Sequence, residues 1–142
     1  MKNTTVHKTI GLLLGLLLLV STNSLAMGTS VENISARTSA ALIEKNQSNP
    51  DFIILDIRTP GEFSAGHIAG ARMIDFYAKS FAKEFRSLDR NKTYLVYCRS
   101  GNRSGQLMQA VEKMDFKKVY NMKSGLVDWV GQGFKLIPSQ PE

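Results

Sequence analysis

The chain has 142 residues and a formal net charge of +6, from 18 basic and 12 acidic side chains. This basic excess is modest and scattered, and it favours small anionic substrates. No basic run with interleaved aromatic residues is present, so the sequence predicts no nucleic-acid partner. A single cysteine excludes any disulfide within the chain.

The amino-terminal segment has the three parts of a cleavable secretory signal. Lys2 and Lys8 precede an apolar run of eleven residues, Ile10–Val20, and Ser24-Leu25-Ala26 supplies the small residues that a signal peptidase reads. Eleven apolar residues are too few to span a bilayer as a membrane anchor. The sequence therefore predicts a signal peptide over residues 1–26 and a periplasmic or secreted protein.

Cleavage after Ala26 would leave residues 27–142, with a net charge near +4 because two lysines are removed. This length is enough for one domain and too short for two, and we expect its core over about residues 37–135. No membrane partner is expected after cleavage, and a monomer is expected. In an oxidising compartment cysteines normally pair, so a lone Cys98 is buried and inert, joined to another molecule, or kept for its reactivity.

The first half of the remaining chain alternates between strand and helix patterns. The polar stretch Thr29–Thr38 reads as a loose lead-in, and Ser39–Lys45 as a short helix capped by Thr38 or Ser39. The continuous apolar run Phe52–Leu55 is typical of a strand buried on both faces. In Thr59–Phe63 a cap residue is followed by proline, which predicts the start of a short helix.

The second half continues the alternation. After a loop over Gly66–Ala71, Arg72–Ile74 reads as a brief strand, and aromatic residues spaced four apart predict a helix over Tyr77–Phe85. The run Tyr94–Tyr97 predicts a strand, and four further segments complete the pattern: a cysteine loop, a helix over Gln106–Met114, a strand over Lys118–Asn121 and a helix over Gly125–Val130. This alternation predicts an α/β domain, a central parallel sheet with helices on both faces.

The loop after Tyr97 carries the residues best suited to chemistry. Strand, cysteine and helix in this order place the thiol of Cys98 at the carboxyl end of a strand, where open α/β sheets bind ligands. A helix start and nearby arginines, here Arg99 and Arg103, lower the pKa of a thiol. Gly101 lets successive backbone N–H groups point inward and form an anion-binding nest. The alternative is a buried core cysteine followed by two solvated arginines.

Three stretches resemble the rhodanese (thiosulfate sulfurtransferase) superfamily, in the order that family has them. The segment Leu55–Ala71 is similar to its first signature, roughly L-D-V-R-x-P-x-E-[FY]-x-x-G-H-I-x-G-A. The loop from Cys98 to Ser104 resembles its cysteine loop. The segment Lys123–Trp129 resembles its closing G-G-x-x-x-W element, with Ser124 in place of the first glycine. With the predicted signal, the chain resembles small periplasmic rhodaneses of the phage-shock type.

This resemblance implies a site and a reaction. Cys98 matches the cysteine that carries a sulfane sulfur as a persulfide, between thiosulfate or a similar donor and cyanide or a thiol acceptor. The substrate-binding loop is then Arg99, Ser100, Gly101, Asn102, Arg103 and Ser104. Arg99 matches thiosulfate-using members, whereas Ser100 stands where the long enzymes often have lysine, which leaves the substrate preference open. No cofactor is implied, and one cysteine with one histidine after the signal makes no metal cluster.

Other assignments remain open. The family's phosphatases and related arsenate reductases use Cys-x5-Arg, but the sixth residue after Cys98 is Ser104, and Arg103 gives Cys-x4-Arg. A non-enzymatic module that binds a partner or delivers sulfur is a further alternative. We expect Asp56, Arg58 and His67 to be structural rather than catalytic. The aromatic residues are expected in the core: Trp129, Tyr77, Phe81 and Phe85.

Overall fold

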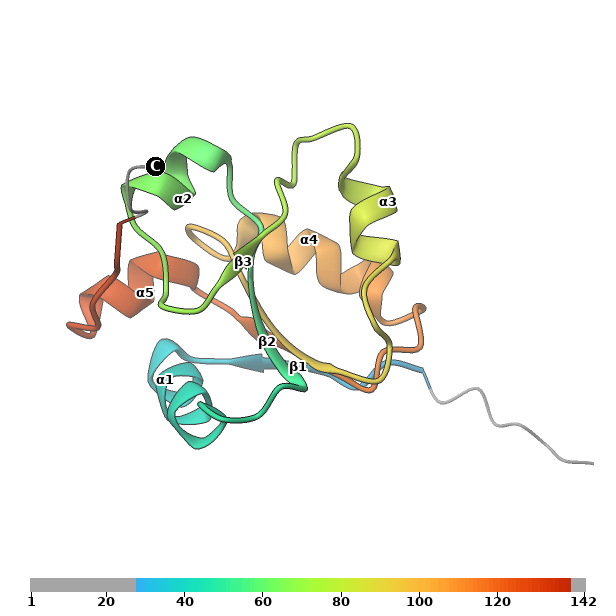
Figure 1. Cartoon of the computed structure of the whole chain (residues 1–142), viewed down its shortest axis with the longest axis horizontal. Coiled ribbons are helices and arrows are strands. Elements are labelled where there is room, and N and C mark those ends of the chain that lie inside the picture. The colour runs from blue at the N-terminus through green and yellow to red at the C-terminus, as the bar shows by residue number, and fades with distance from the viewer. Residues whose placement is uncertain (1–27, 139–142) are drawn as a thin grey trace, which may run out of the picture.

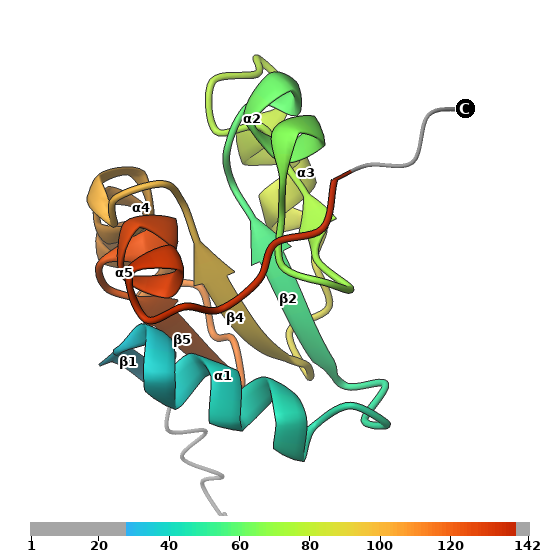
Figure 2. The same ribbon diagram turned by 90° about the vertical axis from the view of Figure 1, so that its left-hand side faces the viewer.

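Five parallel strands form the centre of the computed structural model, which describes residues 28–138 (Figures 1 and 2). The sheet has the order β1-β5-β4-β2-β3. Its strands are β1 (Val31–Ile34), β2 (Phe52–Asp56), β3 (Arg72–Met73), β4 (Thr93–Tyr97) and β5 (Lys118–Met122). The helices are α1 (Ala36–Lys45), α2 (Pro60–Ala65), α3 (Phe81–Arg86), α4 (Asn102–Val111) and α5 (Gly125–Gly131). The predicted α/β class is confirmed, and the predicted signal peptide lies outside the described residues.

Two apolar layers cover the two faces of the sheet. On one face, α1 and α5 pack over strand residues that include Ile54, Leu95 and Met122. On the other face, α3 and α4 pack over a set that includes Leu55 and Val96. Because β2 and β4 send side chains into both layers, their residues form the continuous apolar runs seen in the sequence. Among the described residues, no helix is long and apolar enough to span a membrane.

The first strand was missed in the sequence, and the interpretation of Thr29–Thr38 as a loose lead-in was wrong. The strand β1 pairs with β5 alone and lies at the edge of the sheet, so of its residues only Ile34 is buried. An edge strand with one buried residue lacks the apolar run by which strands are recognised. The helix after it also starts earlier than predicted, because Ser35 caps it by accepting a hydrogen bond from the N–H of Thr38.

The aromatic stripe gives a shorter helix than predicted. The side chain of Asp75 accepts a hydrogen bond from the backbone N–H of Tyr77. The chain continues in turns as far as Ser80, and α3 therefore begins only at Phe81. Phe81 and Phe85 pack against the core as expected. The core prediction for Tyr77 was wrong, since its side chain is 69% exposed.

The carboxyl ends of β2 and β4 bound the crevice where the chain changes direction across the sheet. From β2 the chain moves outward to β3, and from β4 it moves the other way, to β5. In open parallel sheets a ligand binds where connections from adjacent strands diverge in this way. The segment after β2 leads into α2, and the segment after β4 is the cysteine loop. These two segments therefore face each other across the crevice.

Candidate active site

Cys98 lies immediately after β4 and before α4, as the sequence predicted. The residue is only 1% exposed, and its sulfur belongs to the core face that α4 covers. The helix starts at Asn102, earlier than the predicted Gln106, so its first turn is part of the loop itself.

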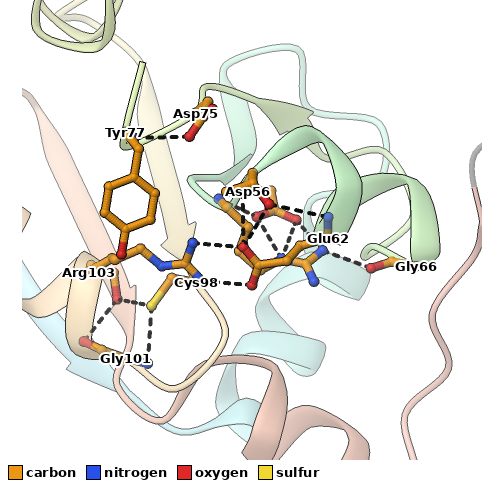
Figure 3. A network of polar contacts seen from close by, with 11 residues as sticks. Asp56, Glu62, Gly66, Asp75, Tyr77, Cys98, Gly101 and Arg103 are labelled. Carbon is orange, nitrogen blue, oxygen red and sulfur yellow. Dashed lines mark hydrogen bonds and ion pairs between the residues drawn. The ribbon is translucent and has the colours of Figure 1, made fainter. Parts of the chain in front are cut away.

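Hydrogen-bond donors surround the sulfur of Cys98. The N–H of Gly101 donates to Sγ at 3.2 Å, and Oγ of Ser104 lies 3.7 Å from Sγ (Figure 3). Burial alone would raise the pKa of the thiol. The backbone N–H and hydroxyl of Ser104, with the N–H groups of Ser100 and Gly101, outweigh burial, and the pKa of Cys98 lies below its ordinary value. The loop is therefore built to hold a thiolate.

The segment Lys123–Trp129, which resembles the closing element of the family, supports the cysteine loop through hydrogen bonds. The N–H groups of Leu126 and Val127 donate to the carbonyl oxygens of Cys98 and Arg99, each at 3.0 Å. Gly125 makes this approach possible: its φ is +57°, and a Cβ there would lie 2.4 Å from the carbonyl oxygen of Cys98. The start of α5 thus fixes the loop from the side opposite the thiolate.

Arg103 is held by an acidic residue that the sequence analysis did not assign to the site. Its two terminal nitrogens each donate to Glu62 of α2, both at 2.8 Å (Figure 3). The hydrogen bond from Arg103 lowers the pKa of Glu62 to about 2. The same bond raises the pKa of Arg103. The predicted role of Arg103 in donor binding stays a prediction, and its charge is already matched by Glu62.

Glu62 has two partners because of its place in α2. Thr59 and Glu62 form a capping box, in which the N–H of Thr59 donates to Glu62 Oε2 at 3.1 Å and Thr59 Oγ1 caps the N–H of Glu62. The Thr-x-x-Glu spacing was the one sequence pattern that involved Glu62. This pattern predicts the start of a helix and does not indicate a contact with Arg103. Tyr77 lies on the other side of Arg103, with its ring centroid 5.6 Å from the guanidinium carbon.

Asp56 and Arg58 form a buried structural pair, as expected. Arg58 donates to both carboxylate oxygens of Asp56 and, at 2.7 Å, to the carbonyl oxygen of Gly66 at the end of α2. Neither residue is bonded to Cys98. By tying the end of β2 to the end of α2, this pair fixes the helix that carries Glu62.

The contacts of the His67 side chain are with Phe63 of α2. Its ring stacks on Phe63 with centroids 3.8 Å apart, and Nδ1 lies 3.0 Å from the Phe63 carbonyl oxygen. Trp129 is buried and donates its indole N–H to the Lys135 carbonyl oxygen, so its core prediction is confirmed. Within residues 28–138, no group of three or more His, Cys, Asp or Glu side chains could hold a metal ion.

The remaining loop residues point outward. Arg99, Ser100 and Asn102 are exposed. Among the described residues Arg99 makes no ion pair. Its positive charge is therefore not matched by a carboxylate, whereas that of Arg103 is. It also lines a groove of about 510 Å³ between α2 and α5. A second cavity, of about 640 Å³, lies at the opposite end of β2 and β4 and contains none of the predicted site residues.

Comparison with models of protein families identifies the domain that contains this loop. The model of the rhodanese-like domain matches residues 39–132, more than half of the chain. The chain belongs to the rhodanese-like domain family. The resemblance read from three separate motifs is thus confirmed, and the rhodanese fold has the five-stranded α/β architecture described above.

Several relatives share this domain. A segment of 80 residues is 36% identical to YqhL of Bacillus subtilis and covers 56% of this chain and 61% of that protein. Another, of 77 residues, is 36% identical to the thiosulfate sulfurtransferase GlpE of Pseudomonas putida, and covers 54% of this chain and 68% of GlpE. The crystal structure of a rhodanese-related protein from Thermoplasma volcanium has a TM-score of 0.61 at 25% identity, covering 76% of this chain and 99% of that one.

Proposed function

We propose that this protein is a sulfurtransferase in which Cys98 carries a sulfane sulfur, as a persulfide, from a donor to an acceptor. The observation that carries the proposal is the cradle of donors around the Cys98 sulfur, which lowers its pKa despite burial. Such a cradle stabilises a thiolate before the reaction and a persulfide anion after it. The rhodanese-like family and the name of the relative GlpE support the same chemistry.

The donor half-reaction that fits this site starts from thiosulfate or a similar anion. The Cys98 thiolate attacks the outer sulfur, a new S–S bond forms, and the bond within the donor breaks so that sulfite leaves with the electron pair. Arg99 is the side chain with charge available to orient the donor anion, because Arg103 is paired with Glu62. No cofactor takes part in this step.

The acceptor half-reaction returns the enzyme to its starting state. Cyanide or a thiolate attacks the outer sulfur of the persulfide, and the electron pair of the broken S–S bond returns to Cys98 as a thiolate. The two halves share one site in turn, which is a double-displacement mechanism. We further propose that a monomer does this in the periplasm or outside the cell, since the predicted signal peptide supports export.

The alternatives have less support. A phosphatase or arsenate reductase of this fold needs a loop one residue longer, and Arg103 here is bonded to Glu62 rather than free to clamp a tetrahedral anion. A module that only binds a partner would not need the donors that hold the Cys98 thiolate.

Steady-state kinetics with thiosulfate and cyanide test the proposal on the unaltered protein and three variants. Cys98→Ser should lose all measurable transfer. Arg99→Gln should raise the KM for thiosulfate about tenfold, as expected when a charge-assisted contact is removed, with a much smaller effect on kcat. Lys83→Gln, an exposed charge change on α3, is the matched control and should behave as the unaltered protein. Activity retained by Cys98→Ser would overturn the mechanism.

A further inference from the structure

The cavity at the amino ends of β2 and β4 lies at the opposite end of the sheet from Cys98. Its volume of about 640 Å³ is in the range of ligand-binding pockets. Its lining residues come from the end of α1, the start of β2, the segment that leads into β3 and the turn before β4. The sulfurtransferase reaction proposed above does not use this cavity, which we call the edge groove.

The edge groove follows an open edge of β2. The strand β3 has two residues and pairs with β2 only at Leu55 and Asp56. Within the described part of the chain, the first half of β2, Phe52–Ile54, therefore has β4 on one side and no strand on the other (Figure 2). All three of these residues line the groove.

Backbone groups of β2 point to this open side. The backbone groups of successive residues in a strand point alternately to its two sides. The N–H of Ile57 donates to β4, whereas the carbonyl oxygen of Asp56 accepts the N–H of Ile74 on the side of β3. By this alternation the N–H of Ile54 and the carbonyl oxygen of Phe52 point to the side of β3, where no strand reaches them. An extended chain in the groove would continue the sheet.

The two faces of the groove differ in their chemistry. On the face toward α1, Ile54 is buried, while Phe52 and Ile43 are only half-buried and leave apolar surface uncovered. Arg72 is paired in register with Leu55, and paired residues of a sheet point to the same face. Because Leu55 belongs to the layer under α3 and α4, Arg72 lies on the face away from α1. Side chains of an added strand would therefore alternate between an apolar surface and Arg72.

The edge groove has a positive charge that the protein does not match. Arg72 and Lys92 line it, and neither makes an ion pair within residues 28–138. Lys92 donates to the carbonyl oxygen of Pro50 at 3.3 Å, so its charge is held at the groove. None of the described lining residues is acidic. Charge complementarity therefore favours carboxylates on the occupant.

We propose that the edge groove is a docking site for an extended segment of a partner protein, in which apolar and acidic residues alternate. The main chain of this segment pairs with Phe52 and Ile54 of β2, as in other cases of strand addition. Its apolar side chains cover Phe52 and Ile43, and its carboxylates lie against Arg72 and Lys92. Docking does not involve Cys98, so the proposal stands or falls independently of sulfur transfer.

Two blocked hexapeptides of equal composition and charge test the proposal by NMR titration of the protein. One alternates glutamate and valine, and the other has three glutamates followed by three valines. The alternating peptide should bind at least about tenfold more tightly, because only its order satisfies both faces while the backbones pair. At saturation it should also slow the hydrogen exchange of the Ile54 amide, which gains a partner.

Two variants test the charge of the groove with the same alternating peptide. Arg72→Gln should weaken binding about fivefold to tenfold, because a charge-assisted contact with a carboxylate is lost. Arg86→Gln makes the same exchange at an exposed position on α3 that does not line the groove. This control should bind the peptide as the unaltered protein does.

Three results would each overturn the proposal. The first is the absence of saturable binding of the alternating peptide at about 1 mM. The second is equal affinity for the two peptides, which would mean that the groove attracts anions without strand pairing. The third is binding that leaves the exchange of the Ile54 amide unchanged, which would place the peptide elsewhere on the protein.

Discussion

Two arginines follow the thiol in the loop, but they differ in the charge they can offer. Arg103 gives both terminal nitrogens to Glu62, and Tyr77 covers its guanidinium group from the other side (Figure 3). Arg99 is exposed and has no ion pair within the described part of the chain. Glu62 therefore sets how much positive charge acts on the sulfur of Cys98.

Replacing Glu62 by glutamine should lower the pKa of Cys98 further. The amide keeps an oxygen for the capping box with Thr59, but the charge of Arg103 is no longer matched and favours the thiolate nearby. The ultraviolet absorbance of the thiolate, followed against pH in the unaltered protein and in Glu62→Gln, measures this change. A higher thiol pKa in the variant would mean instead that Glu62 acts by keeping the loop in shape.

At the scale of elements, the loop depends on the turn between β5 and α5. The cysteine loop and this turn approach each other so closely that a glycine is required in each of them. A Cβ on Gly101 would lie 1.7 Å from the carbonyl oxygen of Lys123, and one on Gly125 would lie 2.4 Å from that of Cys98. Both glycines also have a positive φ, which other residues adopt only with strain.

Two alanine substitutions in α5 should therefore have different effects on stability. Gly125→Ala should reduce the free energy of unfolding by about 2 kcal/mol or more, from left-handed strain and the collision with the loop. Gly131→Ala, at the other end of the helix, meets no atom within 4 Å and should be neutral or stabilise the protein by about 0.5 kcal/mol. Urea unfolding of both variants measures the difference. Equal stability of the two variants would contradict the close contact.

The elements that could be predicted from the sequence are those whose own residues decide their structure. The buried runs of β2 and β4 and the Thr59-Pro60 start of α2 are local patterns, and the cysteine loop follows from their order. The edge strand β1 could not be predicted, because its pairing with β5 supplies its stability. The Glu62–Arg103 contact joins residues 41 positions apart, so no local spacing indicates it.

At the scale of the whole molecule, one buried ion pair joins the sheet to the helix that faces the active site. Asp56 is fully buried and Arg58 is 5% exposed, and their network reaches the carbonyl oxygen of Gly66. Burying two charges is favourable only while each has its partner. The pair therefore fixes α2 and, through it, Glu62 beside the cysteine loop.

Removal of one partner from this pair should be costly. Arg58→Met should reduce the free energy of unfolding by about 3–5 kcal/mol, because Asp56 is left buried without a counter-charge. The double variant Asp56→Leu/Arg58→Met removes both charges and should recover part of that loss. Urea unfolding of the three proteins distinguishes this account from simple loss of packing, in which the double variant would be the least stable.

Acid should also weaken the fold through Glu62. The pKa of Glu62 is about 2 in the folded protein, chiefly because of Arg103, against 4.5 as its ordinary value. The unfolded chain thus takes up the proton first as pH falls, so this contribution is complete above about pH 4.5 and is lost toward pH 2. Stability measured across this range should fall more steeply in the unaltered protein than in Glu62→Gln. Parallel curves would show that the ion pair contributes nothing.

The central claim is that Cys98 carries the transferred sulfur, and intact mass spectrometry tests it most directly. The protein is weighed before and after thiosulfate, and again after cyanide. We predict a gain of one sulfur atom that maps to Cys98 and is lost to cyanide, with thiocyanate released in equal amount. No gain in mass, in protein whose Cys98 still reacts readily with an alkylating reagent, would contradict the account.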